Sequence, residues 1–341
     1  MHDWIELSFK DIIKNGNVSY GIVQPGSNEV SENSIPILRI NNFKNRRLVI
    51  NDIFYVHKDI ECKYARTRLN GSELLITVVG TIGQCIVVPQ KLKGWNVARA
   101  IAVAQVKDNF NKCFIASQFE DEYIKFQIYG SMNDTVQPTL NLKELKEIKF
   151  RIPPLAEQDA IAGVLGSLDD KIDLLQRQNA TLEAMAETLF RQWFIEEAQE
   201  DWEEFSLDCI ADNIKEQAIP VSLDCNTPYV GLEHIDKKNI SLNRVGVSSD
   251  ISSNKFYFSK YDILFGKLRP YFHKVCFAPF NGVCSTDILV IRPKQKAMLP
   301  FCLFAFFQKD IIDFSDYASS GTRMPRTSWN ILSQYKMKKP P

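Results

Sequence analysis

Side chains that could ligate a metal or act as nucleophiles are scattered through this 341-residue chain. Its eight cysteines form no Cys-x-x-Cys pair, and it has only four histidines. Because zinc sites need closely spaced pairs of ligands, we predict no metal site. Cysteines such as Cys85 and Cys302 lie within apolar runs, which is typical of small buried side chains in a reducing compartment. We therefore predict no disulfides.

Three short stretches approach known catalytic patterns, but none is complete. Residues 80–84, Gly-Thr-Ile-Gly-Gln, lack the Lys-Ser/Thr pair of a phosphate-binding loop and better fit a tight turn between strands. Asp134 with residues 147–149, Glu-Ile-Lys, approaches a nuclease pattern, but it falls where a predicted helix passes into a predicted strand. Residues 226–229, Asn-Thr-Pro-Tyr, lack the second proline of the Asn-Pro-Pro-Tyr motif of amino-methyltransferases and any glycine-rich cofactor loop. We predict no catalytic residue and no cofactor.

The composition indicates a globular protein with room for two domains. Hydrophobic residues make up 45% of the chain and charged residues 24%, as in ordinary globular proteins. A chain of this length can form two hydrophobic cores. No apolar run approaches the roughly 20 residues that span a bilayer. The charged amino terminus contains no signal-peptide core, so we predict a cytoplasmic protein without membrane contact.

The chain contains an internal repeat, visible as five pairs of similar segments in the same order. Their offset drifts from 198 to 187 residues, as expected when two domains share a fold but differ in loop length. The pairs are Asp3–Phe9 with Asp201–Leu207, Pro36–Asn42 with Pro228–His234, Leu74–Pro89 with Ile263–Pro279, Ile115–Phe119 with Leu303–Phe307, and Lys149–Pro154 with Tyr335–Pro341.

Each copy of the repeat combines short strands with one longer apolar helix, so we predict an α+β class with mostly antiparallel strands. We expect two similar mixed α/β domains, at 1–154 and 201–341, joined by a long coiled-coil helix at 155–200. The predicted strands are 36–41, 74–79, 85–89 and 100–106, and 228–232, 262–266, 275–279 and 287–292; the predicted helices are 112–129 and 300–317.

The joining segment 155–200 contains no proline, and its last glycine is Gly166. Asn179 falls on position a of the heptad repeat described below. A polar residue buried there would fix the register of the coiled coil, and the alternative is that Asn179 is solvated at the rim. A helix of 36–40 residues would be about 55–60 Å long. Its apolar seam alternates steps of four and three over more than four heptads, which predicts a coiled coil. The seam is Ile161, Leu165, Leu168, Ile172, Leu175, Asn179, Leu182, Ala186, Leu189 and Trp193.

The net charge of zero conceals a segregation of charge along the chain. Residues 155–204 carry 13 acidic and 3 basic side chains, a net charge of −10. Residues 1–154 carry a net charge of +4 and residues 205–341 a net charge of +6. Basic lobes suit a phosphate backbone, and we expect the acidic segment to face away from it.

Residues 152–162, Ile-Pro-Pro-Leu-Ala-Glu-Gln-Asp-Ala-Ile-Ala, run straight into the heptad helix. This stretch resembles the conserved region of type I restriction–modification specificity subunits, and Pro-Pro-Leu-x-Glu-Gln is its specific part. Trp4, the 80–83 turn, residues 140–145 and the Arg-Gln-Trp-Phe at 191–194 agree with that family. The resemblance covers essentially the whole chain.

The resemblance implies a non-catalytic specificity subunit. Each repeat would be a target recognition domain that reads half of a bipartite site in double-stranded DNA. The central helix would dock two methyltransferase subunits, restriction subunits would join them, and all chemistry would belong to these partners. In the family a second conserved helix follows the second domain, whereas this sequence stops at Pro341. Because a lone apolar seam would be exposed, we expect self-association through helix 155–200 when no partner is present.

Sequence reading needs hydrogen-bonding groups at the base edges and cations on phosphates. We expect such groups in loops at corresponding places of both repeats, but with different identities, because the half-sites differ. The candidates are Thr81 and Gln84 against Lys267, Arg269, Tyr271 and His273 in a turn between strands; Ser131, Asn133, Thr135 and Gln137 against Ser320, Thr322, Arg323 and Arg326 after the helix; Arg39, Asn41 and Asn42 against Glu233 and His234 at a strand edge; and Arg66, Arg68 and Arg99.

An alternative is a coiled-coil scaffold that binds other proteins and no DNA. It shares every structural feature predicted above, so only the polar and basic loops distinguish the two functions. A gel shift with random duplex at low salt would separate them.

Overall fold

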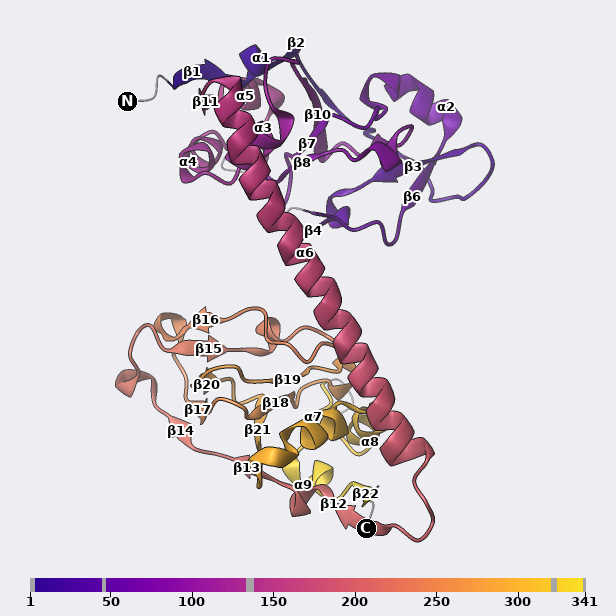
Figure 1. Ribbon diagram of the computed structural model, residues 1–341, viewed down its shortest axis with the longest axis vertical. Coiled ribbons are helices and arrows are strands. Elements are labelled where there is room, and N and C mark those ends of the chain that lie inside the picture. Colours follow the sequence, from indigo (N-terminus) through magenta and orange to yellow (C-terminus); the bar gives the residue numbers. More distant parts are fainter. Residues whose placement is uncertain (1–3, 45–46, 133–137, 320–323, 340–341) are drawn as a thin grey trace. The chain divides into compact units, whose positions relative to one another are not determined.

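The computed structural model describes residues 4–44, 47–132, 138–319 and 324–339. The chain divides into two compact units, unit 1 from Met1 to Leu175 and unit 2 from Gln176 to Pro341. The division falls inside one helix, α6, which runs from Leu155 to Arg191. Figure 1 labels the elements of each unit.

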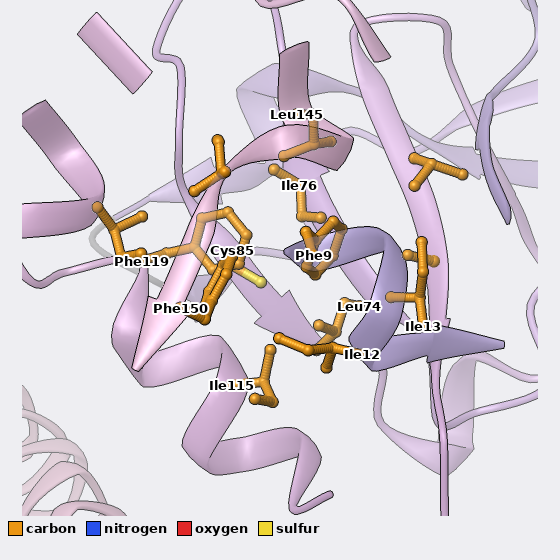
Figure 2. Packing of buried hydrophobic residues seen from close by; sticks show 14 of the residues in the cluster. Phe9, Ile12, Ile13, Leu74, Ile76, Cys85, Ile115, Phe119, Leu145 and Phe150 are labelled. Carbon is orange, nitrogen blue, oxygen red and sulfur yellow. The ribbon is translucent and has the colours of Figure 1, made fainter. Parts of the chain in front are cut away.

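Unit 1 is built around a four-stranded antiparallel sheet with the order β2-β10-β7-β8. Every residue of β7 is buried. Helices cover one face of the sheet, and Phe9, Phe119 and Phe150 meet there in a cluster of rings (Figure 2). The strands are β2 (Ile13–Tyr20), β7 (Leu74–Thr77), β8 (Cys85–Val87) and β10 (Ile101–Val106), and the helices are α1 (Phe9–Ile12), α3 (Lys112–Gln118), α4 (Glu122–Gly130) and α5 (Leu142–Glu147).

Smaller sheets complete unit 1. One of them has the order β6-β3-β9, with β3 and β9 parallel. Another pairs the first strand of the unit with the last, so the chain enters the unit beside the point where α6 begins. These elements are β1 (Ile5–Ser8), β3 (Ser34–Leu38), β4 (Phe43–Lys44), β5 (Arg47–Leu48), β6 (Phe54–His57), α2 (Lys58–Glu61), β9 (Asn96–Val97) and β11 (Lys149–Ile152).

Unit 2 repeats this plan. Its central antiparallel sheet has the order β13-β21-β18-β19, and β12 pairs with β22 as β1 pairs with β11. Its elements are β12 (Glu203–Ser206), β13 (Ala211–Ile214), β14 (Gln217–Ala218), β15 (Pro228–Val230), β16 (Gly246–Val247), β17 (Lys255–Phe258), β18 (Ile263–Gly266), β19 (Val275–Phe277), β20 (Gly282–Cys284), β21 (Ile288–Pro293), α7 (Leu299–Phe307), α8 (Lys309–Tyr317), α9 (Trp329–Leu332) and β22 (Lys336–Lys339).

The internal repeat predicted from the sequence is therefore confirmed, as is the α+β class with two similar units. All five segment pairs fall on equivalent elements, from β1 with β12 to β11 with β22. The parallel pairing of β3 with β9 recurs as β15 with β20. Two domains with one fold thus share backbone positions at which their side chains can be compared directly.

The single helices predicted at 112–129 and 300–317 are wrong in one respect, because each is two helices. Asp121 is extended and caps α4 by accepting a hydrogen bond from the backbone N–H of Tyr123 at 2.9 Å. Gln308 has the same extended backbone between α7 and α8. One extended residue lets both apolar segments turn and pack on the sheet. The predicted strands 36–41 and 228–232 likewise end early, at Leu38 and Val230.

The predicted helix in the joining segment is confirmed as α6, which ends in a π-helical turn at Gln192–Glu196. In unit 1 its first turn buries Gln158, whose side-chain oxygen accepts from the Asn111 backbone N–H at 2.9 Å. In unit 2 the rings of Phe190 and Phe194 lie 5.3 and 4.9 Å from Phe301. The heptad seam between these anchors is exposed, as Leu168 (56%) and Leu182 (62%) show.

The cysteines fit the predicted pattern only in part. Cys85, Cys276, Cys284 and Cys302 are buried, whereas the other four are exposed. Burial raises the pKa of the Cys276 thiol to about 12. All eight lie within the described ranges, and no disulfide joins them. Within those ranges no cluster of three or more acidic, His or Cys side chains is arranged to hold a metal, and no helix is long and apolar enough to cross a membrane.

Candidate nucleic-acid interface

In unit 1 the turn after β7 is shaped by glycines with positive φ, Gly80 (+75°) and Gly83 (+87°), a conformation that other residues adopt at a cost. The segment before α5 returns to this turn, since the Leu140 N–H donates to the Val78 carbonyl at 3.0 Å. The turn and the segment that follows the second predicted place therefore meet at one end of the central sheet.

Unit 2 has the same construction. After β18 the chain makes a 3₁₀ turn at Pro270–Phe272, and the segment before α9 returns to it. The Arg269 N–H donates to the Pro325 carbonyl at 2.8 Å, and Leu268 forms a β-bridge with Arg326. In unit 1 the equivalent bridge joins Val79 and Thr139. Each unit thus presents a turn and a returning segment side by side.

The predicted residues of unit 1 lie around the turn and the returning segment. Thr81 is exposed, and Gln84 and Ser131 are half-buried. The side-chain oxygen of Gln84 has no hydrogen-bond partner among the described residues. Gln84 also lines a cavity of about 370 Å³ with Tyr129, which brings the turn and the end of α4 together. Asn133, Thr135 and Gln137 lie outside the described residues.

The predicted residues of unit 2 form a basic group. Lys267 and Arg269 are half-buried, and Tyr271 and Arg326 are exposed. Arg326 forms an ion pair with Asp287 at 3.4 Å. Burial lowers the pKa of Lys267, with Asp287 acting in the opposite direction. Ser320, Thr322 and Arg323 lie outside the described residues.

His273 is a predicted contact that lies in the interior instead. It is 7% exposed, and its Nε2 is 2.8 Å from the Phe307 carbonyl. Its ring centroid lies 4.5 Å from that of Phe307, and burial lowers its pKa. The side chain therefore packs the turn against α7, and we leave it out of the interface.

The third predicted place is the strand edge that follows β3 and β15. Most of its candidate side chains form contacts that stabilise the turn in which they lie. Asn42 accepts from the Arg39 N–H at 2.8 Å, and His234 accepts from the Gly231 N–H at 2.9 Å through Nδ1. In both units the side chain of the last residue of a 3₁₀ turn thus accepts from the backbone N–H of the residue just before that turn. The Arg39 guanidinium is 3.2 Å from Asp52 and lies over the Phe54 ring. Asn41 and Glu233 are exposed.

The three remaining arginines, Arg66, Arg68 and Arg99, are all exposed, but Arg68 is also bound within unit 1. The Arg68 guanidinium makes two hydrogen bonds to the fully buried carboxylate of Glu61. The Asn96 side chain donates to the same carboxylate at 2.9 Å. Arg68 therefore balances a buried charge, and we leave it out of the interface.

Sequence reasoning missed two features of this region. Asp287 belongs to the basic group but lies in the core-forming part of the sequence, and only the fold brings it to Arg326. Tyr129 and Tyr317 lie in the last turn of the second helix of each pair and are 61% and 94% exposed. Their matching positions at the ends of the two repeated apolar segments were a signal that could have found them.

Comparison with known proteins gives a consistent result. The family model for the type I restriction modification DNA specificity domain matches residues 1–184 and 199–341. The EcoBI specificity subunit of Escherichia coli is 26% identical over 180 residues, which cover 52% of this chain and 37% of that protein. The MjaIX specificity subunit of Methanocaldococcus jannaschii is 26% identical over 234 residues, covering 60% of this chain and 52% of that protein. The matches thus span about half or less of these relatives.

One solved structure shares the fold. The crystal structure of the S subunit of a type I restriction-modification system from M. genitalium matches 98% of this chain and 84% of that chain. The TM-score is 0.54 at 14% sequence identity. At this identity the match establishes the common architecture of the two chains.

Proposed function

This chain belongs to the family of type I restriction modification DNA specificity domains, and from that premise we propose that it reads the sequence of double-stranded DNA. Each unit would read one half of a bipartite site. One observation carries the proposal. Both units present a turn and a returning segment on the same backbone hydrogen bonds, while the side chains there differ between the units. We call this shared backbone arrangement of a turn and a returning segment the frame. A frame that carries different polar groups in the two units suits two unequal half-sites.

The proposed base-reading groups are those that lie on this frame. They are Thr81, Gln84 and Ser131 in unit 1 and Lys267, Arg269, Tyr271 and Arg326 in unit 2. Asn133, Gln137, Thr322 and Arg323 belong to the same loops by sequence and stay in the proposal. Arg66 and Arg99 are exposed cations suited to phosphate contacts.

We propose that chemistry is supplied by other subunits. The exposed seam of α6, with Leu168, Leu182 and their neighbours, is an apolar stripe that suits docking of two methyltransferase subunits, to which restriction subunits would add. Without those partners the same stripe would drive self-association. The functional division would be 1–154, 155–200 and 201–341. A DNA substrate is consistent with a cytoplasmic location.

Binding of the full chain to DNA is tested with a fluorescently labelled random duplex at low salt. We expect saturable binding that weakens as salt rises, and enrichment of one bipartite motif from a random pool. The alternative, a scaffold without DNA contacts, predicts no shift at any protein concentration that stays soluble. That outcome would contradict the proposal.

The proposed partners need a separate test. The full chain is co-expressed with a type I methyltransferase subunit, and the methylated adenines of the host DNA are located by single-molecule sequencing. We expect methylation confined to one bipartite motif, which matches the motif enriched by the chain alone. Methylation independent of the chain would show that it does not direct the methyltransferase.

A further inference from the structure

Three positions at one end of the central sheet are equivalent in the two units. In unit 1 the Val78 N–H donates to Ala100 at 2.9 Å, and the Val78 carbonyl accepts from Leu140 at 3.0 Å. In unit 2 the Lys267 N–H donates to the backbone carbonyl of Asp287 at 2.8 Å, and the Lys267 carbonyl accepts from the Thr327 N–H at 3.1 Å. The bridges Val79–Thr139 and Leu268–Arg326 complete the match. Val78, Ala100 and Thr139 thus correspond to Lys267, Asp287 and Arg326.

The chemistry at these positions differs completely between the units. Val78 is fully buried, and its two neighbours are an alanine and a threonine. In unit 2 all three side chains are charged, and Arg326 lies 3.4 Å from Asp287. The Arg326 side chain is 57% exposed and that of Asp287 is 31% exposed. The group therefore reaches the surface at the end of the sheet.

The fold does not need these charges. Unit 1 makes the same backbone hydrogen bonds with uncharged side chains. In unit 2 burial lowers the pKa of Lys267, Asp287 opposes that shift, and Arg326 adds to it, so keeping this lysine charged at the site carries a cost in stability. A charged group that the shared frame does not require, and that opens to the surface beside the reading turn, points to a ligand with complementary groups.

We propose that Lys267, Asp287 and Arg326 form a guanine-reading centre of unit 2, in which Asp287 is a positioning residue that orients the Arg326 guanidinium. This inference rests on the proposed function. Arginine reads guanine by donating to O6 and N7 in the major groove. A guanidinium has five N–H donors, so one can stay with Asp287 while two face the base. Lys267 adds a donor on the same side. Unit 1 reads a different base at the equivalent place.

The test is selection of bound sequences from a random duplex pool by the full chain and its variants. Arg326→Ala removes the donors, Arg326→Lys keeps the charge but loses the fork, and Asp287→Asn removes the positioning charge. We expect all three to lower the preference for one guanine, by roughly 5- to 150-fold for Arg326→Ala, while the rest of the motif stays. Asp287→Asn should have the smaller effect.

A matched ion pair in the same unit provides the control. Arg244 and Asp236 lie 2.6 Å apart with 58% and 39% of their side chains exposed, close to the values for Arg326 and Asp287. Arg244→Ala and Asp236→Asn should leave every base preference unchanged. If the wild type selects a motif and the Arg326 and Asp287 variants select the identical motif, the centre is refuted. If the wild type selects no motif, the proposed function fails instead.

A transplanted set of side chains tests the frame itself. The triple variant Lys267→Val, Asp287→Ala, Arg326→Thr gives unit 2 the residues of unit 1, which that frame already accommodates. We expect a folded chain, checked by circular dichroism, that still selects the other half-site but no longer requires the guanine. Retention of the guanine in a folded triple variant would overturn the inference.

Discussion

At the scale of single residues, buried charges decide which cations of unit 1 are available to a ligand. The Glu61 carboxylate is fully buried, and Arg68 and Asn96 supply its hydrogen bonds. The Arg68 guanidinium holds the pKa of this carboxyl below its usual value of 4.5. The contribution of the pair to stability is therefore present above that pH and is lost as the pH falls through the lowered pKa.

Replacing Arg68 with alanine should destabilise the chain by about 1–3 kcal/mol near neutral pH, because a buried carboxylate loses its main partner. The measurement is urea unfolding followed by circular dichroism. Arg66→Ala is the matched control, since Arg66 is an exposed arginine two positions away. We expect it to change stability by less than about 0.5 kcal/mol. Equal effects of the two variants would contradict the role given to Arg68.

His273 gives the fold a dependence on pH. Burial lowers its pKa from the usual 6.5, so the folded state favours the neutral ring. The unfolded chain accepts the proton first as the pH decreases. The contribution of His273 is therefore complete above about pH 6.5 and declines below it.

The variant His273→Asn tests this behaviour. Asparagine tolerates the left-handed backbone at this position, where φ is +50°. We expect the variant to be less stable than the wild type at about pH 8, and to lose less stability between about pH 8 and about pH 5.5. Urea unfolding at both values measures the difference. A variant with the same pH dependence as the wild type would show that another group is responsible.

At the scale of elements, α6 combines an anchored end in each unit with an exposed apolar seam. Hydrophobic periodicity predicted the helix because 3.6 residues per turn place the seam on one face. The same periodicity could not identify what covers the seam. The anchors are Gln158 in unit 1 and Phe190 and Phe194 in unit 2. Phe190 and Phe194 lie off the predicted seam, whereas Gln158 precedes Ile161 in the same heptad register.

The proposed self-association predicts that the wild-type chain sediments as a dimer or larger species at high concentration. Leu168→Gln with Leu182→Gln should shift it to monomer, because both side chains are more than half exposed on the seam. Leu174→Gln is the control, since Leu174 is 41% exposed but lies off the seam. Analytical ultracentrifugation distinguishes the outcomes. A monomeric wild type, or a monomer produced equally by the control, would count against association through the seam.

At the scale of the whole molecule, charge is segregated along the chain. The segment 155–204, which contains α6, carries a net charge of −10, between blocks of +4 and +6. Part of this acidity is used within the units. Asp173 pairs with Arg47 at 2.8 Å in unit 1, and Glu183 accepts from Ser241 at 2.7 Å in unit 2. Some of the acidic residues therefore hold α6 to the unit beside them.

The proposed phosphate contacts predict a strong dependence of DNA affinity on salt. For about six contacts, affinity for random duplex should fall about a thousandfold between roughly 50 and 200 mM salt. Arg99→Ala should reduce the slope of log affinity against log salt by about one. Arg244→Ala, which removes an arginine engaged with Asp236, should leave the slope unchanged. A slope near zero for the wild type would exclude a phosphate-bound complex.

The sequence by itself determined the repeat, the α+β class, the central helix and the family, because each depends on periodicity or on segments contiguous in the chain. Only the tertiary structure decided which polar side chains are available. His273 is buried against Phe307, 34 residues away, while Arg326 meets Asp287 from a separate strand end. Burial and ion pairing arise between segments far apart in sequence, so the positions of residues along the chain cannot reveal them.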